Sequence, residues 1–228
     1  VVDLYQHRTP YGQELFDVLL ELVDPSGDGS KIVLDAGCGR GDVARGLVEM
    51  VDRVDAVDPS SAMIRTGKRM PNGEHPKLNW ILGAMEDALL HPPYQLIVTG
   101  LSLHWMDPDV VMGRFADLLA PGGLLAVIEH GQFAKDAPWE EEERQLRWKF
   151  NRNCSVARYQ SNLETIKARG GFETQGERAT APRRRSQSVE DYIKAAQTLG
   201  SFPELLGQRA GDAFVHAMRN LLAPHAQD

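Results

Sequence analysis

The stretch that decides the fold is KIVLDAGCGRGDVARGLVEMVDRVDAVDPS, residues 31–60. It opens with an apolar run at residues 32–34, which suits a strand that is buried on both faces. Three glycines follow at alternate positions and let the backbone turn sharply and approach a ligand closely: Gly37, Gly39 and Gly41. The first half of the stretch therefore predicts a strand that ends in a glycine turn.

The second half predicts a helix and a second strand. Asp42 is the expected N-cap of a helix that carries apolar residues at helical spacing, and residues 54–57 lead to Asp58. Asp58 lies 21 residues after Gly37, the offset at which a nucleotide-binding βαβ unit places a carboxylate on ribose hydroxyls. The third glycine of a dinucleotide motif would fall on Asp42, so the ligand need not carry a phosphate.

The D-x-G-x-G-x-G pattern that begins at Asp35, with Asp58 behind it, resembles the S-adenosylmethionine (SAM) site of the class I methyltransferases. An L-x-P-G-G turn before the apolar run at residues 124–128 is similar to another feature of that family. The resemblance implies an α/β, Rossmann-like fold with a mostly parallel, doubly wound sheet. It also implies SAM as the cofactor and S-adenosylhomocysteine as the product. The alternative is an ordinary βα turn whose glycines serve packing.

Two further segments bear on the cofactor. Tyr5 and Arg8 resemble an aromatic residue and an arginine that close over SAM in the trans-aconitate methyltransferase-like group. At Gly83-Ala84-Met85-Glu86, Ala84 replaces the acid that binds the adenine amino group in the family, which leaves the Met85 backbone, apolar contact or Glu86 to hold adenine. The cofactor-binding residues that the resemblance implies are Tyr5, Arg8, Asp35, Gly37, Cys38, Gly39, Asp58, Pro59, Met63, Ala84, Met85, Glu86, Leu101 and Trp105.

Candidate catalytic residues follow the fourth and fifth expected strands, because ligands of open α/β sheets bind at the carboxyl ends of the strands. His104 is the first candidate for a general base, and Glu129 and His130 are the second. A base is needed only where the acceptor must lose a proton. A purely structural role for His104 stays open. The sequence has no His-x-x-x-His pair or carboxylate cluster that would suggest a metal.

The chain after residue 130 is expected to be mainly helical. Residues 131–158 should form a helical lid over the acceptor, and the expected substrate-binding residues are His104, Trp105, Trp139, Trp148 and Tyr159. Further helices are expected at 159–169, 189–199 and 203–222, with a sixth strand within 172–186. The chain then ends without an alternating apolar run that could form the seventh strand.

We therefore expect one domain over residues 1–228, with a core at about 11–130 and 159–228. The missing strand would leave an exposed sheet edge, so either a monomer or a strand-mediated homodimer is expected.

Composition narrows the class of partner. The net charge of −7 argues against a nucleic-acid partner, and the Arg183–Arg185 cluster is interpreted as a solvated segment. Two cysteines suggest no disulfide framework, which favours a cytoplasmic protein. No apolar run is long enough to span a membrane. The sequence opens on Val1, as expected of a piece of a longer chain.

These observations predict a SAM-dependent methyltransferase that acts on a small organic molecule, by O-methylation of a hydroxyl or a carboxylate. One alternative is a methyltransferase that acts on protein or tRNA. Another is a protein of this fold that binds partners without catalysis, an alternative that Ala84 favours and that Asp35, Gly39 and Asp58 oppose.

Overall fold

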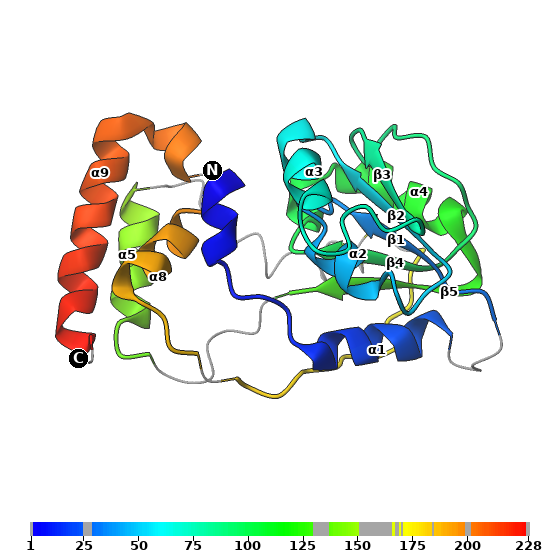
Figure 1. Cartoon of the computed structure of the whole chain (residues 1–228), viewed down its shortest axis with the longest axis horizontal. Helices are drawn as coiled ribbons and strands as arrows, with labels where there is room; N and C mark the ends of the chain where they lie inside the picture. Colours follow the sequence, from blue (N-terminus) through cyan, green and yellow to red (C-terminus); the bar gives the residue numbers. More distant parts are fainter. Residues whose placement is uncertain are drawn as a thin grey trace. The chain divides into compact units, whose positions relative to one another are not determined.

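The computed structural model describes residues 2–24, 29–129, 137–150, 166, 169, 171–183, 185–198 and 202–226. The chain forms two compact units (Figure 1). The sheet unit consists of Tyr11–His130 and Arg158–Thr180, and the helical unit of Val1–Pro10, Gly131–Ala157 and Ala181–Asp228. Residues 181–228 thus group with 131–157, whereas the sequence placed them in the core. The single-domain assignment stays a prediction.

The sheet unit contains a five-stranded parallel sheet in the order β3-β2-β1-β4-β5. Its strands are β1 (Ile32–Ala36), β2 (Arg53–Asp58), β3 (Leu78–Leu82), β4 (Tyr94–Gly100) and β5 (Leu119–Ile128). The central strands are almost wholly buried, as their continuous apolar runs predict. The predicted Rossmann-like, doubly wound arrangement is confirmed.

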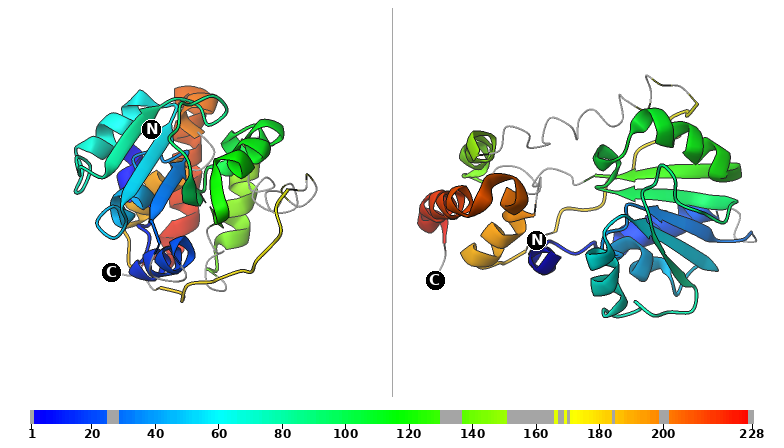
Figure 2. Two further views of the ribbon diagram at one scale, coloured as in Figure 1. Left: turned by 90° about the vertical axis from the view of Figure 1, so that its right-hand side faces the viewer. Right: turned by 90° about the horizontal axis from the view of Figure 1, so that it is seen from above.

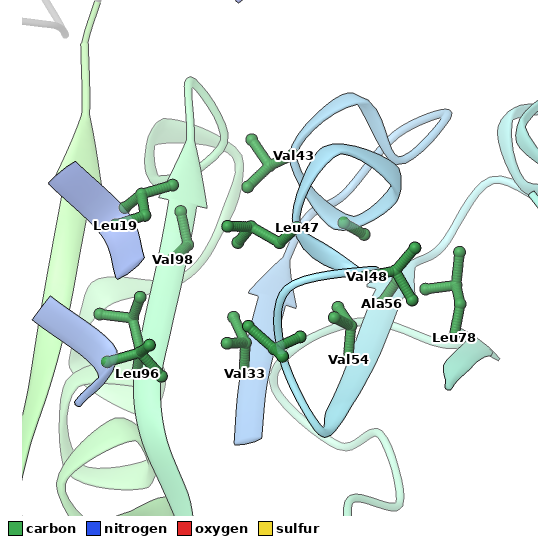
Figure 3. Close-up of a cluster of buried hydrophobic side chains, with 13 residues drawn as sticks. Leu19, Val33, Val43, Leu47, Val48, Val54, Ala56, Leu78, Leu96 and Val98 are labelled. Atoms are coloured by element: carbon green, nitrogen blue, oxygen red, sulfur yellow. The ribbon is translucent and has the colours of Figure 1, made fainter. Parts of the chain in front are cut away.

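Helices cover both faces of this sheet (Figures 1 and 2). On one face, α1 (Gln13–Val23) and α2 (Asp42–Leu47) pack on the inward side chains of the central strands (Figure 3). On the other face, α4 (Pro108–Leu118) packs with Ile166 and Phe172. The edge strand β3 and its neighbour β2 contact α3 (Ser61–Lys68). The glycine turn therefore begins from a rigid, doubly covered strand.

The predicted sixth strand is wrong. Residues 172–183 and 185–188 have no regular secondary structure and pair with no strand of the described chain. The segment has few apolar side chains to bury, and Phe172 already packs into the core of the sheet unit. Residues 173–183 are all exposed, and Pro182 has no N–H group to donate to a neighbouring strand.

The helical unit contains η1 (Val2–His7), α5 (Glu140–Phe150), α8 (Val189–Gln197), α9 (Phe202–Leu222) and η3 (Ala223–His225). The segment expected to be helical at 131–158 contains α5, and the helices predicted at 189–199 and 203–222 are confirmed within two residues. Most of the helix expected at 159–169 lies outside the described residues. Ile193, Phe214 and Met218 form the centre of its core. None of the described helices combines the length and apolar content that a membrane crossing requires.

An ion pair is buried in the helical unit. Arg147 donates through Nε to the Glu143 carboxylate at 2.8 Å and through a second nitrogen to the same oxygen, one turn earlier in α5. The other Glu143 oxygen accepts from the Tyr192 hydroxyl at 2.5 Å. Because a buried charge is costly unless it is paired and hydrogen-bonded, these three side chains constrain how α5 and α8 pack.

A buried carboxylate also ties together the amino-terminal halves of three strands. Asp55 in β2 is fully buried and accepts from the Tyr94 hydroxyl at 2.6 Å and from Asn79 at 2.9 Å. Tyr94 starts β4 and Asn79 lies in β3, so one side chain links strands on both sides of β1. Tyr94 is also fully buried, and its pKa is raised by burial and by the bond to Asp55.

We predict that Tyr94→Phe lowers the free energy of unfolding by about 1–3 kcal/mol, the range for a buried hydrogen bond to a charged group. Urea denaturation at pH 7 measures it. In an Asp55→Asn background the same change should cost less, because the partner no longer carries a charge. An equal cost in both backgrounds would show that the hydrogen bond to Asp55 is not what stabilises the strands.

Candidate functional site

The glycine turn between β1 and α2 has an alternating left-handed backbone. The φ angles are 71° at Gly37, 57° at Gly39 and 73° at Gly41, values that residues with a side chain rarely adopt. Gly41 is the N-cap of α2, so the prediction that Asp42 caps the helix is wrong. Asp42 is instead the first helical residue, and its carboxylate accepts from Arg40 at 2.9 Å and from Arg45 at 2.6 Å.

Asp58, at the end of β2, faces this turn. Its Oδ2 atom accepts from the Gly39 N–H at 2.8 Å, and its Oδ1 atom accepts from the Ser60 N–H at 2.8 Å. Burial raises the pKa of Asp58, and the two N–H groups oppose that rise. A Cβ atom placed on Gly39 would have no neighbour within 4 Å. The middle of the turn therefore borders open space beside a fixed carboxylate.

Asp35 lies beneath the same turn, at the carboxyl end of β1, and is 1% exposed. Its Oδ2 atom accepts from the Ala44 N–H in α2 at 3.0 Å, whereas its Oδ1 atom is buried without a hydrogen-bond partner in the described structure. Burial raises the pKa of Asp35 to about 7, and the nearby carboxylates of Asp42 and Asp58 add to the rise. Asp35 therefore has a free acceptor atom beneath the turn, and its carboxyl group changes protonation near neutral pH.

Ser102, which follows the end of β4, contacts the glycine turn and was not among the residues predicted from the sequence. The Ser102 hydroxyl donates to the Ala36 carbonyl at 2.6 Å, and a Cβ atom on Gly37 would lie 2.5 Å from the Ser102 Cβ atom. Leu101 turns the chain here with a left-handed backbone, φ 55°. The position of Ser102 just after a buried strand is the signal that could have identified this residue.

His104 and Trp105 form η2 (Leu103–Trp105) just after this turn. Their ring centroids are 5.1 Å apart and the ring planes are tilted by 43°. Trp105 is 61% exposed, whereas the His104 side chain is half-buried. The structure therefore places both residues at the carboxyl edge of the sheet, where ligands of open α/β sheets bind.

The residues predicted to hold adenine differ in their exposure and contacts, and their role at a cofactor stays a prediction. Met85 is 3% exposed and belongs to the core beneath α4, so its side chain cannot line a pocket. The Glu86 carboxylate accepts from the Asp107 N–H at 2.8 Å. Leu82 was not predicted, yet it is 62% exposed at the end of β3, in register with Asp58. The position of Leu82 at the end of an apolar strand, just before Gly83, is the sequence signal that could have identified it.

Tyr5 and Arg8 belong to the helical unit rather than the sheet unit. The Arg8 guanidinium lies 4.0 Å from the centre of the Tyr5 ring and donates to the hydroxyl and the carbonyl of Thr198, each at 2.7 Å. These bonds fasten the start of the chain to the end of α8. Their role at a cofactor stays a prediction.

The other predicted residues differ in their surroundings. Cys38 is half-buried, and desolvation raises the pKa of its thiol well above the ordinary value, which disfavours a nucleophilic thiolate. Pro59 and Glu129 are exposed, and Met63 is half-buried in α3. His130 and Tyr159 lie outside the described residues.

The two predicted tryptophans of the lid both lie in the helical unit. Trp139 packs edge-on against Tyr192, with ring centroids 6.3 Å apart, and near His225 at 5.0 Å. Trp148 is 55% exposed on α5. Contact of either residue with a substrate stays a prediction. The described residues hold no group of three or more His, Cys, Asp or Glu side chains that could bind a metal.

Comparisons with known proteins agree with this arrangement. Residues 33–123 match the family described as methyltransferase domain. An uncharacterized methyltransferase of Mycobacterium tuberculosis is 31% identical over 116 residues, which cover 50% of this chain and 56% of that protein. The malonyl-acyl-carrier-protein O-methyltransferase 1 of Ilyobacter polytropus is 28% identical over 102 residues, 43% of this chain and 38% of that protein.

A solved structure from Anaeromyxobacter dehalogenans, provisionally named a type II methyltransferase, matches with a TM-score of 0.63 and 23% identity, covering 94% of this chain and 89% of that one. This match shows the fold. The chain spans about half the length, or less, of the two relatives above. The family match at residues 33–123, the parallel sheet and the glycine turn together support a methyltransferase domain of the class I, SAM-dependent type in this part of the chain.

We predict that Asp35 makes stability depend on pH. An acid whose pKa is higher in the folded chain binds more protons when folded, so the free energy of unfolding should fall as the pH rises from about 4 to about 7. One pKa unit corresponds to about 1.4 kcal/mol, so the decrease that Asp35 causes is at most several kcal/mol. In Asp35→Asn this decrease in the free energy of unfolding should be absent. Urea denaturation at a series of pH values measures it.

Glu49→Gln is the control for Asp35→Asn, because Glu49 is exposed just beyond the same helix α2. This variant should keep the wild-type dependence of stability on pH. Parallel curves for the wild type and Asp35→Asn would contradict the assignment.

Proposed function

We propose that this protein is a SAM-dependent methyltransferase that transfers a methyl group to an oxygen atom of a small organic acceptor. The observation that carries the proposal is the open position at Gly39 beside the buried Asp58 carboxylate. A side chain at Gly39 would fill this space, so the glycine keeps it free for a ligand. The other sequence features that support SAM are Asp35 and the spacing between the turn and Asp58.

The residues present fit SAM chemically. The backbone fixes the carboxylate of Asp58 through two N–H groups, and the remaining lone pairs can accept from the two ribose hydroxyls. The unpartnered oxygen of Asp35 and the negative charge around it favour the cationic groups of the cofactor. When bound, SAM supplies an activated methyl group, and the products are the methylated acceptor and S-adenosylhomocysteine.

The chain's own task is then to orient the acceptor and to exclude water. Trp105 offers an exposed aromatic face for an organic acceptor at the carboxyl edge of the sheet. A hydroxyl acceptor must lose its proton, and His104 is the proposed base that takes it. A carboxylate acceptor needs no base. Support for oxygen as the acceptor comes from the Ilyobacter polytropus relative, which is named as an O-methyltransferase.

The test of cofactor binding compares two glycines with left-handed backbones and open surroundings. Gly39 has φ 57° and Gly122, in an exposed turn of β5, has φ 78°. An alanine in this conformation costs about 1–2 kcal/mol at either place. We predict that Gly39→Ala weakens SAM binding by about tenfold or more, whereas Gly122→Ala lowers the melting temperature similarly and leaves SAM affinity unchanged. Isothermal calorimetry measures the affinity.

Absence of SAM binding by the wild-type protein would reject the proposal in favour of a protein that binds partners without this cofactor. A methylation screen with labelled SAM and fractionated small molecules, protein and tRNA then identifies the acceptor class. Label that appears only in protein or tRNA would replace the small-molecule assignment.

We predict that His104→Ala lowers kcat for a hydroxyl acceptor by about 10²-fold, while SAM affinity changes little, because a general base acts on the acceptor and not on the cofactor. Steady-state kinetics with the identified acceptor measure this. His91→Ala is the control, because His91 is an exposed histidine in the loop before β4. A His104→Ala enzyme with full turnover would assign the histidine to packing beside Trp105.

A further inference from the structure

Trp80 lies in β3 and reaches well beyond its own strand. Its side chain packs against the core cluster that α1 and α2 form with the sheet, and its indole N–H donates to the Gly73 carbonyl at 2.8 Å. The indole is therefore fixed at its nitrogen, which leaves the six-membered ring pointing to other contacts.

The six-membered ring touches the last glycine of the turn. A Cβ atom on Gly41 would lie 2.4 Å from Cη2 of Trp80, 3.0 Å from Cζ3 and 3.3 Å from Cζ2. Separations under 3.0 Å do not occur between real Cβ atoms and their neighbours, so Gly41 must lack a side chain for the indole to sit here. The three nearest atoms to that position all belong to Trp80, which makes this ring the support of the turn at Gly41.

The same ring edge touches α3. A Cβ atom on Gly67 would lie 2.4 Å from Cη2 of Trp80 and 2.5 Å from the carbonyl oxygen of Arg40. Gly67 is thus in contact with both the indole and the residue that precedes Gly41. Two glycines from separate elements face one indole edge, and the ring sets the distance between the glycine turn and α3.

Hydrogen bonds to the segment after α3 reinforce this contact. Arg45 of α2 donates to the Arg40 carbonyl at 3.1 Å and to the Pro71 carbonyl at 3.0 Å, and Asn72 donates to the Arg45 carbonyl at 3.2 Å. Trp80 binds Gly73 in the same segment. These hydrogen bonds therefore join the turn, α2 and residues 71–73 to one another, and the Trp80 indole is bonded to the same segment.

We propose that Trp80 is a positioning residue for the cofactor: it holds the glycine turn at the distance from α3 at which Gly39 and Asp58 can bind SAM together. Gly39 lies two residues before Gly41, and Asp58 lies three residues before the start of α3. A shift between the turn and α3 therefore changes the geometry between Gly39 and Asp58. This inference rests on the proposed function and assigns the geometry of its site to a residue that need not touch the ligand.

The test measures SAM affinity by calorimetry and the melting temperature on the same samples. Trp80→Phe removes the outer ring and the N–H donor, and we expect SAM affinity to fall by about fivefold or more, since small misplacements at a site are costly. The control is Phe115→Leu, which truncates a fully buried aromatic ring in α4, on the opposite face of the sheet. It should lower the melting temperature and keep SAM affinity within about twofold, because distant sites act independently.

A second comparison separates positioning from a general loss of packing. Gly41→Ala alone should weaken SAM binding because the new methyl group collides with the indole. In the Trp80→Phe background the methyl group has room. The double variant should therefore lose less SAM affinity than the product of the fold-losses measured for the two single variants. Trp80→Tyr takes the place of Trp80→Phe if that variant does not fold.

The outcomes are distinct. Wild-type affinity in Trp80→Phe, or losses in the two single variants that simply multiply, would overturn the role of Trp80 and leave the proposed function intact. A wild-type protein that binds no SAM would overturn the proposed function, and the inference with it, before any variant is compared.

Discussion

The hydrogen bond from the Gly39 N–H to the Asp58 carboxylate is the interaction on which the site depends. It joins the turn after β1 to the end of β2. These two strands pair in parallel, with Ile32 opposite Arg53 at one end and Ala36 opposite Val57 at the other. The bond can form only because the turn comes so close, and that approach requires glycine where Ser102 and Trp80 meet the backbone. A short polar contact at the sheet edge is therefore set by apolar packing on both sides of the turn.

Much of the sheet unit could be predicted from the sequence because its signals are local. Apolar runs mark the five strands, and capping side chains mark helix starts: Ser60 accepts from the Met63 N–H, and the Asp107 side chain accepts from the Asp109 N–H. The spacing of the glycines and Asp58 predicts the cofactor site in the same way, and the structure brings the glycine turn and Asp58 together. Ser102 has only its position just after a buried strand as a local signal, and Trp80 has none, because they contact glycines 65 and 39 positions away along the chain.

The sixth strand could not be excluded from the sequence, because burial depends on partners that a local pattern does not contain. Residues 173–183 can extend, but they have too little apolar surface to join a sheet. The Met85 side chain fills the core beneath α4, which leaves its backbone for the predicted contact with adenine. In α5, Glu143 and Arg147 lie in a charged run, and Tyr192 of α8 completes their hydrogen bonds in the interior.

The composition of the helical unit has a consequence for synthesis on the ribosome. Every strand of the sheet has been translated by Ile128, and Phe172 completes the core cluster under α4. The helical unit, in contrast, draws η1 from the first residues and α9 from the last, and Arg8 finds its partner only at Thr198. The nascent chain can therefore complete its sheet early, while the first ten residues wait for the final helices before they acquire their native contacts.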